Sequence, residues 1–206
     1  MNIGILDYGM GNTASVFNAV YSQGWDPIFV KNPIELDEIS HLIIPGVGSY
    51  GSAMNLLAQK DLTNFINAFY CAGKPIMGIC LGMQILSSFG VEGGKNNGLN
   101  LIKGNVQPLK RVEGLNIPHT GWNNISIKKD HPILEGIKKD VDFYFVHSYA
   151  FCVESDNDLF ATCEYGQTFT SIVGDKNVFG VQFHPEKSQK NGLKIIDNFC
   201  LWDGKC

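Results

Sequence analysis

The sequence predicts an α/β fold with a central mixed, mainly parallel β-sheet. Up to Cys80, short apolar strand patterns alternate with helical patterns, which is the order that βαβ units produce. From about residue 105 to residue 183 the chain is β-rich and interrupted by turns. At 206 residues, with 44% hydrophobic and 17% charged residues, it is too apolar for disorder and long enough to bury a substantial core.

The first half contains four strand patterns separated by helical ones. Each strand pattern is a short apolar run bounded by Gly, Pro or polar residues, which is typical of buried parallel strands. The strands are expected at 3–6, 27–30, 41–44 and 75–79. The helices are expected at 12–22, 51–57, 61–71 and 81–86.

The second half predicts a series of shorter strands and a final helix. The strands are expected at 105–109, 124–128, 142–147, 159–164, 168–174 and 178–183, and the helix at 190–202. No internal repeat, low-complexity tract or linker interrupts the chain. We therefore expect one domain over residues 1–206.

Charge and hydropathy exclude several classes of protein. The 16 basic and 20 acidic residues give a net charge of −4, whereas a nucleic-acid surface normally requires a basic excess. No apolar run approaches the ~18 residues of a membrane span, and the N-terminus lacks the basic region of a signal peptide. No C-x-x-C pattern indicates zinc. The protein is expected to be cytoplasmic, without nucleic-acid or membrane partners, metal or cofactor.

The pentapeptide from Gly78 to Gly82 has the pattern G-x-C-x-G, the thiol version of a nucleophile elbow. Small residues on both sides allow a sharp strand-to-helix turn that exposes Cys80. The helix N-terminus stabilises a thiolate, and the Leu81 N–H can form half of an oxyanion hole. Gln84 lies one turn further on the same helix face, where its amide can hold an amide substrate. The alternatives are a buried core cysteine and an exposed helix glutamine.

A cysteine nucleophile needs a base oriented by a third group. His184 precedes Pro185, which favours extended backbone at His184. Residues i and i+2 of an extended chain project to one side, so Glu186 is placed to hold the His184 ring. The alternative is a loop histidine beside a solvated glutamate.

These two motifs together resemble those of the class I, triad-type glutamine amidotransferases, whose pattern is G-[IV]-C-L-G-x-Q followed by F-H-P-E. Further segments are similar to one branch of that family, the glutaminase subunits of imidazole glycerol phosphate synthases. These segments are D-Y-G-M-G-N at 7–12, P-G-V-G at 45–48, P-H at 118–119 with G-W-N at 121–123, Y-F-V-H-S-Y at 144–149 and P-E-K-S at 185–188. The resemblance runs from end to end and implies the family's three-layer α/β fold.

The resemblance implies a glutaminase mechanism with Cys80, His184 and Glu186 as the catalytic triad. The thiolate attacks the side-chain carboxamide of L-glutamine, His184 protonates the departing ammonia, and water hydrolyses the glutamyl thioester. Val47 and Leu81 are implied as oxyanion-hole donors. A peptide flip at 45–48 is expected to respond to the ligand state of a partner. The positions matching the family's glutamine-binding residues are Gly46, Gln84, Glu92, His147, Ser148 and Tyr149.

The resemblance also implies a heterodimer. In this branch, ammonia passes to a (β/α)8-barrel cyclase subunit, which makes imidazole glycerol phosphate in histidine biosynthesis. The positions matching residues that face the barrel are Asn12, Trp122, Tyr144 and Lys187. Lys187, next to Glu186, is a candidate to link the interface to the active site by a salt bridge. The alternatives are core packing for the two aromatic residues and a solvated charge for Lys187.

Departures from the branch leave a second acceptor open. Thr13-Ala14 and Thr120 differ from its usual residues, and the uncharged stretch 87–91 before Glu92 is less acidic than is common in the branch. Related subunits supply ammonia for nucleotide-sugar amidation in surface-polysaccharide synthesis, with a barrel partner of the same kind.

Three further readings compete with the amidotransferase. Residues 9–14 fit G-x-G-x-x-A, but Lys31-Asn32 stands where a dinucleotide fingerprint requires an acid. A regulatory subunit without catalysis is disfavoured by the intact triad. A cysteine peptidase or isomerase on the same elbow is disfavoured by Gln84, which suits a small amide substrate.

Overall fold

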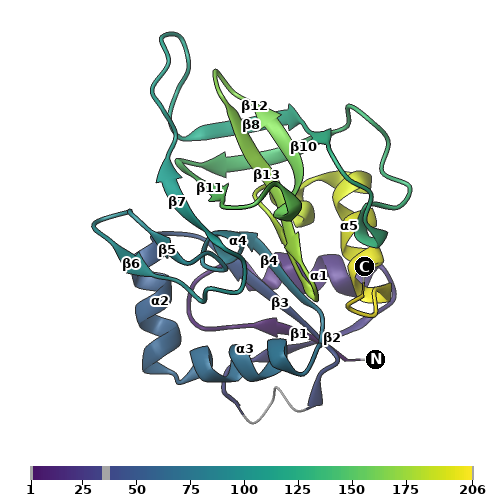
Figure 1. Ribbon diagram of the computed structural model, residues 1–206. Coiled ribbons are helices and arrows are strands. Elements are labelled where there is room, and N and C mark those ends of the chain that lie inside the picture. Colours follow the sequence, from purple (N-terminus) through teal and green to yellow (C-terminus); the bar gives the residue numbers. More distant parts are fainter. Residues whose placement is uncertain (1, 34–37, 206) are drawn as a thin grey trace.

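The computed structural model describes residues 2–33 and 38–205 and has three layers, with helices on both faces of a long mixed sheet (Figure 1). Within these residues the main sheet has eight strands in the order β2-β1-β3-β4-β14-β13-β12-β9. Neighbours from β2 to β14 pair in parallel, and those from β14 to β9 pair antiparallel. The predicted mixed, mainly parallel sheet is confirmed.

The strands of the main sheet are β1 (Asn2–Leu6), β2 (Asp26–Val30), β3 (His41–Gly46), β4 (Ile76–Cys80), β9 (Ser126–Ile127), β12 (Leu159–Glu164), β13 (Thr168–Asp175) and β14 (Val178–Val181). Two smaller sheets, ordered β10-β8 and β11-β7-β5-β6, stand at one end of the main sheet. Their strands are β5 (Phe89–Gly90), β6 (Asn96–Asn97), β7 (Gly104–Pro108), β8 (His119–Asn124), β10 (Asp142–His147) and β11 (Tyr149–Val153). The α-helices are α1 (Thr13–Ser22), α2 (Tyr50–Gln59), α3 (Leu62–Cys71), α4 (Leu81–Gln84) and α5 (Gln189–Leu201). Short 3-10 helices cover Pro132–Leu134, Asp156–Asp158 and Pro185–Lys187.

The apolar runs of the parallel strands are buried on both faces, so successive residues enter different cores. On β3, Ile43 packs in a cluster with Val20 of α1 and Ile196 of α5. The next residue, Ile44, packs in a second cluster with Ile66 of α3. This is why these strands read as continuous apolar runs instead of alternating patterns. Among the described residues, no helix is both long enough and apolar enough to cross a bilayer.

Most predicted helices and strands are observed with bounds that differ by a few residues from the prediction. The larger differences are in strands that pair with segments distant in the sequence. The strand expected at 124–128 is reduced to β9, and β8 was not predicted. β8 has a polar sequence with Gly121 at φ +143°, and pairing with β10 holds it in place. β11, also not predicted, pairs with β7.

The helix after Cys80 is shorter than predicted. It was expected over 81–86, but α4 ends at Gln84. The carbonyls of Ile85 and Leu86 accept hydrogen bonds from the N–H groups of Leu99 and Leu101, 2.8 and 2.9 Å away. Since these carbonyls are taken by a distant segment, the helical ladder stops after one turn.

Candidate active site

A pocket of about 300 Å³ lies at the carboxyl ends of β3 and β4, and it contains the predicted nucleophile and base. This edge of a parallel sheet is where α/β proteins bind ligands. The pocket is lined by Val47, Gly48, Cys80, Leu81, Gln84, Glu92, Pro118, Val146, His147, Ser148, Tyr149 and His184. A larger hollow of about 840 Å³, lined from within residues 127–139, contains none of the predicted catalytic side chains.

Cys80 occupies a sharp strand-to-helix turn. It is the last residue of β4 and the N-cap of α4, with φ 54° and ψ −110°. A Cβ at Gly78 would lie 2.6 Å from the Gly82 carbonyl oxygen, and a Cβ at Gly82 would lie 1.7 Å from the Ile44 carbonyl oxygen. Only glycine fits at both flanking positions, so the predicted elbow is confirmed.

The two predicted oxyanion-hole residues, Val47 and Leu81, both line the pocket beside Cys80. Leu81 is the first residue of α4, and a first-turn N–H has no acceptor within its own helix. Val47, 42% exposed, and Gly48, at φ +104°, form the loop after β3 and also line the pocket. Leu81 and the loop after β3 therefore both line the pocket beside Cys80.

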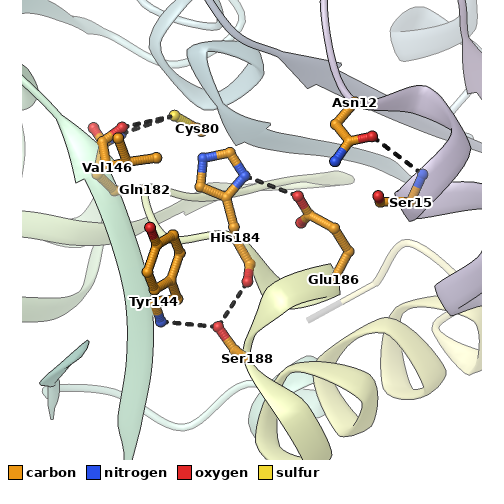
Figure 2. Close-up of polar contacts among 9 residues, drawn as sticks. All are labelled: Asn12, Ser15, Cys80, Tyr144, Val146, Gln182, His184, Glu186 and Ser188. Atoms are coloured by element: carbon orange, nitrogen blue, oxygen red, sulfur yellow. Dashed lines mark hydrogen bonds and ion pairs between the residues drawn. The ribbon is translucent and has the colours of Figure 1, made fainter. Parts of the chain in front are cut away.

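The ring of His184 lies between Cys80 and the Glu186 carboxylate (Figure 2). Glu186 Oε1 accepts a hydrogen bond of 2.9 Å from Nδ1 of His184, and both side chains are almost fully buried. This bond leaves Nε2 facing Cys80 as the proton acceptor. The predicted pairing is present, but its geometry differs: His184 is extended, while Glu186 lies in the 3-10 helix Pro185–Lys187.

Ser188 clamps the His184 loop to β10. Its hydroxyl donates to the His184 carbonyl at 2.6 Å and accepts from the Tyr144 N–H at 3.0 Å (Figure 2). The His184 N–H in turn donates to the Tyr144 carbonyl at 2.9 Å. Three hydrogen bonds thus orient the base even though β14 ends at Val181, short of the predicted end at 183.

The environment of His184 favours the imidazolium. Burial lowers the pKa of His184, but the Cys80 thiolate and the Glu186 carboxylate outweigh burial and raise this pKa to about 10. Nε2 has no hydrogen-bond partner among the described residues, and the Cys80 thiol instead donates to the Val146 carbonyl at 3.8 Å. The His184 ring therefore lies between Cys80 and the Glu186 carboxylate, in surroundings that favour its imidazolium form.

The second histidine of the pocket has the opposite character. His147 Nδ1 donates to the Tyr149 carbonyl at 2.9 Å, and His147 Nε2 accepts from His119 Nδ1 at 3.1 Å. Burial, with smaller contributions from His119 and His184, lowers the pKa of His147 to about 3. His147 is therefore neutral at pH 7, has no free ring nitrogen and cannot serve as the base.

The His184–Glu186 pair should stabilise the fold in a pH-dependent way. The pKa of His184 is raised in the folded state, so the stabilisation is complete below about pH 6.5 and is lost as pH rises through about 10. We expect Glu186→Gln to lower the free energy of unfolding by about 1.5–3 kcal/mol at pH 6. This difference should shrink by pH 10. Urea unfolding at pH 6, 8 and 10 measures it, with the exposed Glu113→Gln as the control. A difference that does not depend on pH would contradict the assignment.

Two side-chain amides, those of Gln84 and Gln182, form a hydrogen-bonded chain from the pocket to Cys80. Gln84 Nε2 donates to the Tyr149 carbonyl at 2.9 Å and to Gln182 Oε1 at 3.1 Å. Gln182 Nε2 donates to the Cys80 sulfur at 3.8 Å. Glu92 closes the rim, where its carboxylate accepts the Tyr50 N–H at 2.7 Å.

The remaining predicted residues lie around the pocket. Gly46 is buried at the end of β3. A side chain does not fit there, because a Cβ would lie 2.8 Å from the Tyr8 hydroxyl oxygen and 2.9 Å from the Gly82 nitrogen. Asn12 caps α1 by accepting the Ser15 N–H at 3.4 Å, and α1 contacts the 3-10 helix that carries Glu186.

The other predicted interface residues form one cluster beside the His184 loop. The rings of Trp122 and Tyr144 meet edge to face at 6.0 Å, and Lys187 Nζ lies 5.8 Å from the centre of the Tyr144 ring. Trp122 is 48% exposed, so it is not the core residue that the alternative expected.

Sequence reasoning missed Gln182 and Ser188 as site residues, although Gln182 directly precedes the F-H-P-E motif and Ser188 ends the P-E-K-S segment. It also missed Tyr8, which is fully buried and whose hydroxyl has no hydrogen-bond partner among the described residues. Burial, and secondarily the Cys80 thiolate, raises the pKa of Tyr8, so its hydroxyl stays protonated. Within residues 2–33 and 38–205, no three His, Cys, Asp or Glu side chains are grouped to hold a metal ion.

Comparisons with known proteins agree with this geometry. The family model described as glutamine amidotransferase class-I matches residues 4–202. "Imidazole glycerol phosphate synthase subunit HisH" of Sulfurimonas denitrificans is 44% identical over 96% of each chain. The protein of the same name from Methanosarcina acetivorans is 47% identical over 95% of this chain and 96% of its own. Among solved structures, PurLQS from Thermotoga maritima aligns with a TM-score of 0.77 at 22% identity over 97% of each chain, which supports the fold.

Proposed function

The chain belongs to the class I glutamine amidotransferase family, and we propose that it is the glutaminase subunit of an imidazole glycerol phosphate synthase. Relatives that carry this subunit name are 44% and 47% identical to it over nearly their whole length. One observation carries the chemistry: Cys80, at the strand-to-helix turn, lies beside the buried His184–Glu186 pair in a small pocket that is also lined by the Gln84 amide.

The first half of the reaction releases ammonia. His184 Nε2 accepts the Cys80 proton, and the sulfur attacks the carboxamide carbon of L-glutamine. Negative charge develops on the carboxamide oxygen and is held by the N–H groups of Leu81 and Val47; each such donor is typically worth about 10²–10³ in rate. The C–N bond then breaks as His184 returns the proton to nitrogen, leaving ammonia and a glutamyl thioester on Cys80.

The second half restores the enzyme. His184 takes a proton from water, and the resulting hydroxide attacks the thioester carbon. The C–S bond breaks, glutamate leaves, and the sulfur departs as a thiolate beside the imidazolium. Glu186 stabilises that imidazolium in both halves through the 2.9 Å bond to Nδ1.

The polar end of the substrate is assigned to the rim. Both N–H groups of Gln84 are engaged, by the Tyr149 carbonyl and by Gln182, so its Oε1 remains to accept from the substrate. Gln84 Oε1 and the Glu92 carboxylate together suit the α-ammonium group of glutamine. The backbone of His147, Ser148 and Tyr149 lines the same pocket and receives the α-carboxylate.

The partner is assigned to the face that carries Trp122, Tyr144 and Lys187, with Asn12 beside it. An exposed tryptophan next to a tyrosine and a cation is typical of the centre of a protein interface. Tyr144 is also bonded through its backbone to Ser188 and His184. A (β/α)8-barrel cyclase docked here would press on the segment that holds the base and receive ammonia directly. The ligand state of this partner is proposed to control the flip of the peptide at 45–48, and with it the direction of the Val47 N–H.

The function is tested by ammonia release from glutamine. The purified chain is assayed alone, with an imidazole glycerol phosphate synthase cyclase subunit, and with that subunit and its nucleotide ligand. We expect large stimulation by the liganded cyclase. Trp122→Ala should lose the stimulation and keep the reaction of Cys80 with an electrophilic glutamine analogue.

Other outcomes distinguish the alternatives. Cys80-dependent activity that ignores this cyclase would favour the subunit that serves nucleotide-sugar amidation. No ammonia release and no labelling of Cys80 would overturn the amidotransferase assignment.

A further inference from the structure

The Tyr149 carbonyl determines which way the side-chain amides of Gln84 and Gln182 are turned. A carbonyl oxygen can only accept hydrogen bonds, so the amide group of Gln84 that faces the Tyr149 carbonyl is its NH2. The same NH2 donates to Gln182, so Gln182 must present its oxygen to Gln84. The NH2 of Gln182 then faces the Cys80 sulfur, 3.8 Å away.

We propose that Gln182 is a positioning residue that favours the thiolate of Cys80 and couples it to Gln84 in the substrate site. Gln182 is 0% exposed, and its backbone N–H is bonded to the Ser171 carbonyl at 2.9 Å. The side chain therefore has no water to bind in place of the sulfur. This inference rests on the proposed glutaminase function for the reaction that the thiolate performs.

One backbone group and one side-chain group contact the Cys80 sulfur, and they have opposite effects on its thiolate form. The Val146 carbonyl accepts from the thiol, at 3.8 Å, and repels a thiolate. Gln182 Nε2 donates and stabilises a thiolate, because hydrogen bonds to a charged acceptor are roughly twice as strong as neutral ones. Deprotonation thus removes the hydrogen bond to Val146 and strengthens the one from Gln182, while the imidazolium of His184 stabilises the thiolate.

Other titratable groups face this site from several elements. His147 of β10 has a pKa lowered by burial to about 3, and Tyr8, which follows β1, has a pKa raised by burial. Both are neutral between about pH 5 and pH 9. Glu92 lies at the rim, bonded to the Tyr50 N–H at the start of α2. Neither His147 nor Tyr8 therefore changes charge in that range, and the charged groups beside the sulfur are His184 and its partner Glu186.

Two substitutions separate the donor from the acceptor of Gln182. Gln182→Glu keeps an oxygen for Gln84 and places an acceptor against the sulfur. Gln182→Met keeps the length and removes both groups. Gln107→Glu is the matched control, since Gln107 lies on β7 outside the pocket and donates to Asn105 at 2.8 Å.

The first readout needs no substrate. Alkylation of Cys80 by iodoacetamide is followed by mass spectrometry from pH 5 to pH 9 in the full-length chain. We expect the midpoint of this pH profile to move upward by about one pH unit in Gln182→Met and further in Gln182→Glu. A structural role would lower the rates without moving the midpoint.

The second readout is glutaminase activity with the liganded cyclase. Gln182→Glu is expected to lower kcat by about 10- to 100-fold at pH 7. KM should stay within about threefold, because Gln84 keeps its partner. Raising the pH should recover part of the loss. Gln182→Met should lower kcat and also raise KM.

The outcomes keep this inference apart from the proposed function. Unmoved alkylation profiles in both Gln182 variants, beside an active wild type, would overturn the role of Gln182 and leave the function intact. An inactive wild type whose alkylation profile still depends on Gln182 would overturn the function alone.

Discussion

Replacing Cys80 with Ser or Ala is expected to remove glutaminase activity while the protein stays folded. The serine hydroxyl is a far weaker nucleophile near pH 7, and alanine offers no atom to form the thioester. We expect losses of roughly 10⁴-fold or more, as is typical when a nucleophile is removed. The two variants differ in what they leave: serine keeps a hydroxyl within reach of Gln182, and alanine leaves only the oxyanion donors.

The experiment compares ammonia release, labelling by an electrophilic glutamine analogue, and thermal unfolding. Cys71→Ser is the matched control, because Cys71 is an exposed thiol at the end of α3 and outside the pocket. It should keep both activity and labelling. Ammonia release by Cys80→Ala at more than a few per cent of the wild-type rate would show that another group attacks glutamine.

The largest effect on stability is expected from Gly82→Ala. The new Cβ would stand 1.7 Å from the Ile44 carbonyl oxygen and 2.8 Å from its carbon, and both are backbone atoms of the neighbouring strand. No rotamer relieves this overlap, so α4 must move away from β3 and the elbow must open. We expect a loss of more than about 4 kcal/mol in the free energy of unfolding, or an insoluble protein.

Gly51→Ala is the control for this substitution. A Cβ at Gly51, in the first turn of α2, would meet only the Asn96 side chain, at 3.0 Å. That side chain can shift, and alanine is the better helix former, so the change should stay within about 1 kcal/mol. Urea unfolding measures both variants. A Gly82→Ala protein with wild-type stability would show that the elbow does not need its close approach to β3.

The structure explains why one of two pocket histidines is the base. His184 has a carboxylate partner and a neighbouring thiolate, which raise its pKa to about 10. His147 has only a backbone carbonyl and another histidine, and burial lowers its pKa to about 3. Both stand in conspicuous motifs of the sequence. The charged groups around each ring make the difference: His184 can carry a proton at pH 7, whereas His147 stays neutral and holds fixed hydrogen bonds.

By itself the sequence determined the features whose causes are local. The parallel strands could be predicted because a strand buried on both faces must be a continuous apolar run. Such a run is visible in the sequence without knowing which strands lie beside it. The elbow is indicated by Gly78 and Gly82 on either side of Cys80, although the backbone that excludes a Cβ at Gly82 is that of Ile44 on the neighbouring strand. The pairing of His184 with Glu186 was predicted because the two residues are two positions apart with a proline between them. The turn that joins them is a 3-10 helix, whereas an extended chain was expected.

Tertiary structure alone decided the features that depend on distant partners. β8 exists because β10 pairs with it, and α4 stops at Gln84 because residues 99–101 take the next carbonyls. The contacts of Gln182 with Gln84 and Cys80 join residues 98 and 102 positions apart. A hydrogen bond is directional and effective only within about 3–4 Å, so no local pattern can announce such a pair; the packed sheet has to bring the two side chains together.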